Sequence, residues 1–253
     1  MIRVEGLTKD YGPRRAVANL SFEAKQGEVV GFLGPNGAGK TTTMRILTGY
    51  MPPTEGSAQV AGFDVVDESM EVRKRVGYLP ETVPLYTDMT TLEYLTFMAD
   101  LRRLPEAADR AYEALEMVGM DSRANSYISS LSKGMRQRIG LAQALIHQPE
   151  VLILDEPTIG LDPAQVVEVR NLIRDMGKQR TVLLSTHILS EAQQICDRVL
   201  IINKGHIIAE DTPQNLQSRL VGSERASLRV RGDGDGLTRV LQKVKGVRHV
   251  AAQ

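Results

Sequence analysis

Four apolar runs of strand length alternate with polar segments of helical periodicity, and this alternation limits the fold more than any other feature of the sequence. The runs are VVGFL (29–33), VLILD (151–155), TVLLST (181–186) and RVLIIN (198–203). Strands that are apolar on both faces and alternate with helices are typical of a parallel sheet covered by helices. We therefore expect an α/β core.

Segments with other patterns interrupt or precede this core. Residues 2–12 and 17–28 alternate between apolar and polar side chains and have glycine at or near their ends, which predicts an antiparallel subsheet that residues 57–65 continue. From Thr91 to about Val118 the pattern becomes helical. We expect a first domain at 1–222 that contains a helical subdomain at about 83–148.

The composition changes after Gly222. SLRVRG alternates like a strand, LTRVLQKVKG is helical, and VRHVAA begins another strand. This order is half of a small α+β module. We therefore expect a C-terminal appendage at 223–253, with the sequence stopping inside it.

The charge balance argues against a strong global field. Lys plus Arg equals Asp plus Glu at 31 each, so net charge would not draw the protein onto nucleic acid or anionic lipid. Apolar runs such as VLIL (151–154) are far shorter than the roughly 20 residues of a spanning helix. With one cysteine and no signal-peptide pattern at the N-terminus, we expect a cytosolic globular protein.

The stretch GPNGAGKT (34–41) fits the phosphate-loop pattern G-x-x-x-x-G-K-[ST] and lies between a predicted strand and a predicted helix. Backbone N–H groups and the positive helix end would surround an anion there. Lys40 would reach the β and γ phosphates, and the Thr41 hydroxyl would ligate Mg²⁺. A glycine-rich turn with a solvated lysine is the alternative interpretation, and we favour the nucleotide. The residues assigned to it are Gly34, Pro35, Asn36, Gly37, Ala38, Gly39, Lys40, Thr41 and Thr42.

Two carboxylates lie at the carboxyl end of the second apolar run, in VLILDEPTIGLD. The carboxyl ends of parallel strands meet at one edge of a sheet, so we expect these side chains to lie near the loop at 34–41. Adjacent strand residues point to opposite faces, so one carboxylate could bind a metal ion while the other activates water. We assign Asp155 to the metal and Glu156 to the general base. On its own, such a pair is more often a solvated start of a loop.

The segment SSLSKGMRQRIGLAQALIHQPEVLILDEPTIGLDP (129–163), with the motif order across residues 1 to about 220, resembles the ATP-binding subunits of ABC transporters. LSKGM (131–135) occupies the signature segment of that family. It departs from the usual L-S-G-G-Q at Lys133 and Met135. These departures are similar to those of exporters that have separate, ABC-2-type membrane subunits.

The resemblance implies a P-loop NTPase core with a mostly parallel sheet, an antiparallel β-subdomain and a helical subdomain. It implies an ATPase that uses ATP and Mg²⁺ and dimerises, with itself or a similar subunit, around two ATP molecules. An ABC-2-type permease would hold it at the cytoplasmic face of the cell membrane for export. A soluble ABC ATPase acting on ribosomes or DNA is the alternative. The single cassette, the lack of sustained heptads and the neutral charge argue against a nucleic-acid partner.

The resemblance also assigns roles to residues outside the loop. Ser132 and Gly134 would contact the γ phosphate bound to the other subunit, and Asp162 would lie across the dimer interface. From the residues alone, Ser132 is a plausible N-cap of an amphipathic helix, and an ordinary capped helix remains the alternative. The residues expected on the apolar face of that helix are Met135, Ile139, Ala142 and Ile146.

Three further positions carry over from the family. Tyr11 would stack on adenine, although packing is the commoner role of an aromatic near an N-terminal strand. His187 would form a hydrogen bond with the γ phosphate and orient the attacking water, although a histidine at a strand end is commonly structural. Glu81 stands where the family most often has Gln, and its carboxylate would contact Mg²⁺.

Aromatic residues gather in and around the predicted helical segment. We expect them to build its small core, with some of them docking a coupling helix of the membrane partner. We expect Cys196 to pack as a small buried hydrophobe. The aromatic residues are Tyr86, Tyr94, Phe97, Tyr112 and Tyr127.

Overall fold

The computed structural model describes residues 1–220, 240, 241 and 244. The chain divides into two compact units, Met1–Leu216 and Gln217–Gln253. The predicted appendage at 223–253 lies outside the described residues except at three positions, and the predicted boundary after residue 222 stays a prediction.

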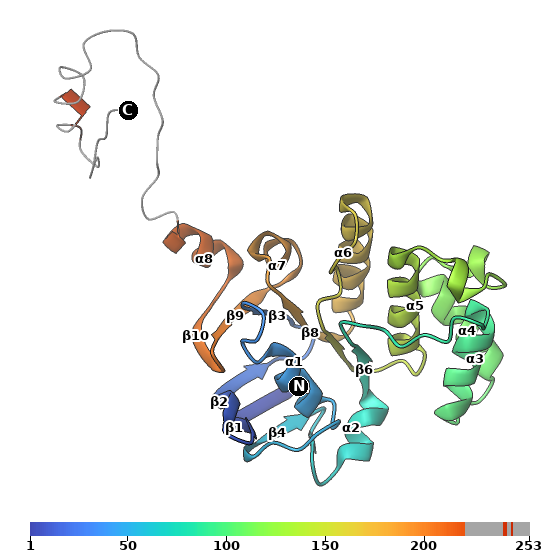
Figure 1. The fold of residues 1–253 in the computed structure, drawn as a ribbon, viewed down its shortest axis with the longest axis horizontal. Helices are drawn as coiled ribbons and strands as arrows, with labels where there is room; N and C mark the ends of the chain where they lie inside the picture. The colour runs from blue at the N-terminus through green and yellow to red at the C-terminus, as the bar shows by residue number, and fades with distance from the viewer. Residues whose placement is uncertain (221–239, 242–243, 245–253) are drawn as a thin grey trace. The chain divides into compact units, whose positions relative to one another are not determined.

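The first unit joins a central sheet, a smaller sheet and a group of helices (Figure 1). Its strands are β1 (Ile2–Tyr11), β2 (Arg14–Ala24), β3 (Val29–Leu33), β4 (Glu55–Val60), β5 (Phe63–Asp64), β6 (Val76–Leu79), β7 (Val151–Leu154), β8 (Thr181–Thr186), β9 (Arg198–Asn203) and β10 (His206–Asp211). The helices are α1 (Lys40–Leu47), α2 (Ser69–Arg75), α3 (Thr91–Leu101), α4 (Ala107–Met117), α5 (Lys133–Leu145), α6 (Pro163–Gly177), α7 (Leu189–Ile195) and α8 (Pro213–Leu220), with short 3₁₀ turns at Asp121–Arg123 and Ile128–Ser130.

The central sheet has the strand order β10-β9-β3-β8-β7-β6. All its neighbouring pairs are parallel except β9 with β10. The predicted α/β core is therefore confirmed, and the four apolar runs form β3, β7, β8 and β9. Because these strands run in the same direction, the residues that follow β3, β7 and β8 come to one edge of the sheet.

Alternate residues of the central strands enter two separate hydrophobic cores. Val30 and Phe32 of β3 pack with α1 and the smaller sheet, whereas Val29 and Leu33 pack with the opposite core. That second core is built mainly from α3 to α7. Burial on both faces explains why these strands are apolar throughout.

The smaller sheet has the order β2-β1-β4-β5, and all its pairs are antiparallel. It confirms the subsheet predicted from residues 2–12, 17–28 and 57–65. Gly205, in the turn between β9 and β10, accepts a hydrogen bond from the Ala18 N–H at 2.9 Å. This contact fixes the β1–β2 hairpin beside the edge of the central sheet.

Helices α3, α4 and α5 form one end of the unit (Figure 1). Thr90 caps α3 and forms a capping box with Glu93, in which each side chain accepts from the other residue's N–H. Ser132 caps α5 by accepting a hydrogen bond from the Met135 N–H at 3.3 Å. The capping role predicted for Ser132 is therefore confirmed. The four residues expected on the apolar face of α5 lie in the core or pack against it.

The expected aromatic core of this helical segment is confirmed only in part, since the ring of Tyr86 contacts those of Tyr94 and Phe97. Only Tyr94 is fully buried, and its hydroxyl donates to Gln143 at 2.6 Å. Tyr86 packs edge-on against Tyr94 but is half exposed, and Tyr112 and Tyr127 are exposed as well. Leucine, alanine and isoleucine make up most of the interior around Tyr94.

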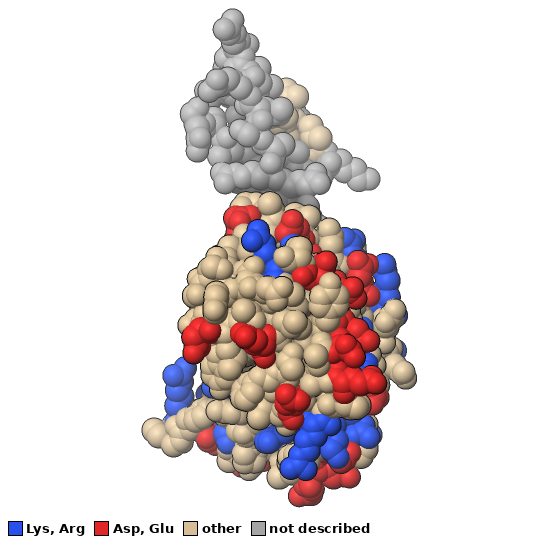
Figure 2. All heavy atoms as spheres, turned by 90° about the vertical axis from the view of Figure 1, so that its right-hand side faces the viewer, with Lys and Arg blue, Asp and Glu red and all other residues tan. Residues whose placement is uncertain are grey.

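Figure 2 looks onto the end of the unit that carries α3 and α4. Uncharged atoms cover much of this face, with isolated acidic side chains among them, and the basic side chains lie toward its edges. Within the described part of the chain, no helix has the length and apolar character needed to cross a bilayer.

Candidate active site

The loop after β3 carries the phosphate-binding pattern to the carboxyl edge of the central sheet. Gly37 and Gly39 have φ values of 78° and 108°, which lie in the left-handed region that favours glycine. A Cβ at position 39 would lie 2.6 Å from the carbonyl oxygen of Ala16 in β2. Glycine is therefore required at 39 both by the conformation of the loop and by the approach of β2.

Helix α1 begins at Lys40 and leaves its first N–H groups available. No side chain caps it, and its first turn contains no acidic residue. The first N–H groups of a helix have no partner inside the helix and carry the positive end of its dipole. The sequence thus places an uncapped helix start where an anion would be bound.

Three predicted catalytic side chains lie in contact. The Nζ atom of Lys40 is 3.1 Å from Oε1 of Glu156, and both side chains are more than nine-tenths buried. Nδ1 of His187 is 2.9 Å from Oε2 of the same carboxylate. Lys40 also donates to the Gly34 carbonyl at 2.7 Å. The expected meeting of the loop with the carboxylates that follow β7 is confirmed.

The two carboxylates after β7 diverge for a reason that strand alternation does not supply. Strand β7 ends at Leu154, one residue earlier than we predicted, so Asp155 and Glu156 lie outside it. Glu156 has a φ of 47°, a left-handed backbone conformation that side chains other than glycine seldom adopt. This turn of the backbone directs Glu156 to Lys40, whereas Asp155 accepts a hydrogen bond from Ser185 at 2.6 Å.

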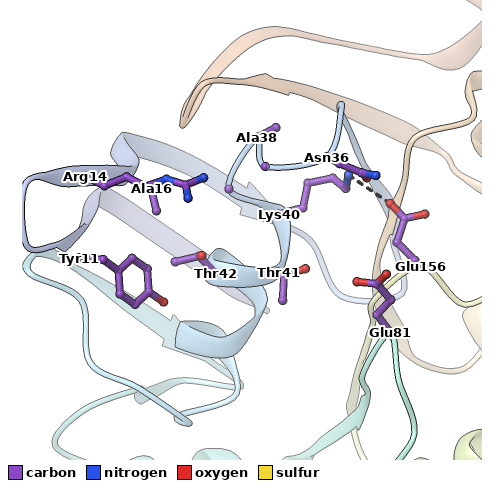
Figure 3. Close-up of a pocket in the computed structure, with 12 residues that line it drawn as sticks. Tyr11, Arg14, Ala16, Asn36, Ala38, Lys40, Thr41, Thr42, Glu81 and Glu156 are labelled. Carbon is purple, nitrogen blue, oxygen red and sulfur yellow. Dashed lines mark ion pairs between the residues drawn. The ribbon is translucent and has the colours of Figure 1, made fainter.

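Twelve residues line a pocket of about 350 Å³ beside the loop (Figure 3). The lysine points toward Glu156, and the side chains of Thr41 and Glu81 lie below that pair. Tyr11 lines the opposite side, with its hydroxyl 3.2 Å from the sulfur of Met51. The lining residues are Tyr11, Arg14, Ala16, Asn36, Gly37, Ala38, Gly39, Lys40, Thr41, Thr42, Glu81 and Glu156.

The oxygen atoms near this pocket suit a magnesium ion. Oδ2 of the fully buried Asp155 has no hydrogen-bond partner among the described residues, which is costly unless a cation or a polar ligand meets it. Thr41 and Glu81 offer a hydroxyl and a carboxylate. Mg²⁺ is commonly held by one or two carboxylates together with phosphate oxygens, so a larger acidic cluster is not needed.

Tyr78 of β6 lies within the electrostatic reach of Asp155. Burial, and after it the negative charge of Asp155, raise the pKa of the Tyr78 hydroxyl. Tyr78 therefore stays a neutral phenol near the predicted metal ligand, and it adds no negative charge there.

A sequence profile described as "ABC transporter" matches residues 17–159, which is more than half of the chain. The chain belongs to the ABC transporter family. The resemblance stated from the signature segment and the motif order is thereby confirmed.

Individual ABC proteins agree with this assignment. The linearmycin resistance ATP-binding protein LnrL of Bacillus subtilis is 36% identical over 253 residues, which cover 99% of this chain and 80% of that protein. The bacitracin transport ATP-binding protein BcrA of Bacillus licheniformis is 40% identical, and the match covers 87% of this chain and 72% of BcrA. The dimeric, post-hydrolysis structure of the cassette MJ0796 with ADP and Pi is 26% identical, with a TM-score of 0.76, covering 84% of this chain and 99% of that one.

The predicted fold class and ATPase activity are confirmed by these relationships. The chain is an ABC ATPase subunit that binds ATP, hydrolyses it and powers transport. The roles of individual residues stay predictions.

The residues that the resemblance assigns to contacts across a dimer lie apart from the pocket of their own chain. Ser132 and Gly134 are at the N-terminus of α5, and Asp162 caps α6 by accepting from the Gln165 N–H at 3.0 Å. A Cβ at Gly134 would lie 2.5 Å from Gln165, so the two helix starts pack closely. None of the three residues lines the pocket.

Sequence reasoning missed two residues at the ABC site. Arg14, at the start of β2, lines the pocket, and its guanidinium is directed toward the phosphate loop (Figure 3). The only available signal was its position three residues after Tyr11. Ser185, at the end of β8, contacts both residues that follow β7, and a serine inside an apolar strand was the signal for it.

Proposed function

We propose that this chain drives export through an ABC-2-type permease, to which it attaches at the cytoplasmic face of the membrane as one of two ATPase subunits. The contact of Lys40 with Glu156 and of Glu156 with His187 carries the ATPase half of the proposal. The similarity to proteins named for bacitracin transport and linearmycin resistance supports the export half.

The residues divide the work of hydrolysis. Lys40 and the N–H groups at the start of α1 hold the phosphates and offset their charge as it builds up in the transition state. Glu156 accepts a proton from the attacking water, and His187 orients that water by its contact with Glu156. Thr41, Glu81 and Asp155 would hold Mg²⁺, which would supply further positive charge against the phosphate oxygens.

Dimerisation completes the proposed site. Ser132, Gly134 and Asp162 lie outside the pocket of their own chain, which suits contacts with nucleotide held by a second copy or a similar subunit. Such an arrangement places two ATP molecules between two chains, so that binding closes the dimer and hydrolysis opens it.

The surface of α3 and α4 is the part we assign to the permease. Five large apolar or aromatic side chains are exposed in and beside these helices, on a face that is largely uncharged (Figure 2). Exposed apolar patches of this kind mark protein contacts. The exposed residues of this region are Tyr86, Leu101, Tyr112, Met117 and Tyr127.

The experiment is to purify the tagged chain from detergent-solubilised membranes and identify its partner by mass spectrometry. We expect a protein with several membrane spans, and ATPase activity that rises when both are placed in liposomes. A matched variant, Tyr127→Ser, should lower recovery of the partner without changing ATP binding. Co-purification with ribosomal RNA and no membrane protein would show that the chain serves a soluble ABC system instead.

A further inference from the structure

Ser185 connects the two carboxylate residues that follow the neighbouring strand. It lies fully buried near the end of β8, and its Oγ donates to Oδ1 of Asp155 at 2.6 Å. The same Oγ accepts a hydrogen bond from the backbone N–H of Glu156 at 2.8 Å. One hydroxyl therefore touches both the predicted metal ligand and the residue predicted to activate water.

We propose that Ser185 is a positioning residue for ATP hydrolysis, which sets the orientation of Asp155 and the backbone of Glu156 at once. This inference rests on the roles proposed above for those two carboxylates. It assigns a function to a residue that neither the phosphate loop nor the signature segment includes.

The direction of the two hydrogen bonds follows from their donors. A backbone N–H can only donate, so the Ser185 oxygen accepts from Glu156 and its single proton goes to Asp155. Oδ1 of Asp155 is thereby occupied, and Oδ2 is the oxygen left without a partner among the described residues. Ser185 thus selects which carboxylate oxygen faces a metal ion, as outer partners of metal ligands do.

The second hydrogen bond acts on the shape of the backbone. Glu156 has a φ of 47°, a conformation that a residue with a side chain keeps only when its surroundings hold it there. The hydrogen bond from its N–H to Ser185 is one such restraint, and it lies inside the buried core. This conformation carries the Glu156 carboxylate to Lys40 and His187.

If Ser185 were only a structural residue, its substitution would lower thermal stability and leave kcat and the Mg²⁺ dependence of ATP binding unchanged. Ser185 follows Val182, Leu183 and Leu184, which are all buried in apolar cores. Alanine is smaller than serine and suits an apolar strand, so Ser185→Ala should fit without a clash. Thr181 provides a matched control at the other end of β8. It is also buried, and its hydroxyl accepts from the Gly27 N–H and donates to the Lys25 carbonyl, away from the pocket.

The test compares Ser185→Ala, Ser185→Cys and Ser185→Thr with Thr181→Val in the full chain. We expect the alanine and cysteine variants to lower kcat, and to weaken the Mg²⁺ dependence of ATP binding, by about 10- to 100-fold. The affinity for ATP in EDTA should stay within about twofold of the wild-type value. This measurement also shows that each variant is folded. Threonine keeps a hydroxyl and should restore most of both losses. Thr181→Val should lower thermal stability alone.

Two results would overturn the inference. One is a Ser185→Ala variant whose kcat and Mg²⁺ dependence of ATP binding equal those of the wild-type chain. The other is a Thr181→Val variant that loses as much kcat as Ser185→Ala does. Either result leaves the proposed function intact as long as the wild-type chain hydrolyses ATP. Failure of the wild-type chain to bind Mg-ATP would instead remove the proposed function itself.

Discussion

The amino group of Lys40 lies 3.1 Å from the carboxylate of Glu156, and both side chains are more than nine-tenths buried. The residue predicted to hold phosphates and the residue predicted to activate water thus form one ion pair. Phosphate oxygens and Glu156 therefore compete for the same ammonium group. This competition links nucleotide binding to the position of the general base.

Glu156→Gln should lower ATP turnover at least about 100-fold, because the amide cannot accept the proton from water. ATP affinity should hold or rise, since the variant removes the negative charge that offsets Lys40. Steady-state ATPase assays and ATP titrations measure the two effects, and gel filtration with Mg-ATP should show a dimer. Glu168→Gln, at an exposed position of α6, is the control and should behave as wild type. Unchanged turnover in Glu156→Gln would show that another group is the base.

Arg14→Ala should weaken ATP binding by about two- to fivefold, the range of an exposed charge pair. Arg14 lines the pocket, and its guanidinium has no ion-pair partner in the described part of the chain. Its neighbour Arg15 carries the same charge but binds Asp10 at 2.8 Å. Arg15→Ala therefore controls for the loss of charge and should leave the ATP dissociation constant unchanged. Equal weakening in the two variants would count against a direct contact of Arg14 with nucleotide.

Acid should destabilise the chain through His147. Burial, and after it the charge of Arg102, lower the pKa of His147 to about 4 from 6.5. Its Nε2 lies 3.0 Å from the Val76 carbonyl, and its buried Nδ1 has no partner among the described residues. Since the unfolded state takes up the proton first, stability is complete above pH 6.5 and falls toward pH 4 as the pH is lowered.

The expected loss from His147 is about 2 kcal/mol of unfolding free energy between pH 7.5 and pH 5. Urea denaturation at the two values measures it. His147→Gln can still donate to Val76 but does not titrate, so it should reduce the pH dependence by about that amount. The same slope in wild type and variant would place the acid sensitivity elsewhere.

Gly34→Ala should destabilise the fold by about 1–3 kcal/mol, the usual cost of overpacking. A Cβ at this first glycine of the phosphate loop would clash with the Ile202 carbonyl oxygen of β9. Gly62→Ala is the control, because nothing lies within 4 Å of its added Cβ and only its φ of 87° is unfavourable. Thermal unfolding of both variants separates packing from backbone conformation. A melting temperature of Gly34→Ala at or above that of Gly62→Ala would contradict this explanation.

Much of the fold could be predicted because strand burial is visible as local pattern. Three of the four apolar runs coincide with β3, β8 and β9, and the fourth differs from β7 by one residue. The aromatic residues of the helical segment were predicted only in part, because nothing in a sequence says which rings three packed helices can enclose. Tyr94 is enclosed, whereas Tyr112 and Tyr127 are exposed.

The sequence by itself determined the phosphate loop, the uncapped start of α1 and the arrival of Asp155 and Glu156 at the same sheet edge. These features follow from the local patterns of two strands, β3 and β7, and of the residues directly after each of them. Only the tertiary structure decided that Lys40 pairs with Glu156, that Arg14 faces the loop and that Ser185 holds both carboxylate residues. Those contacts join residues that lie far apart in the sequence, and their formation depends on backbone angles such as the left-handed φ of Glu156, which no spacing encodes.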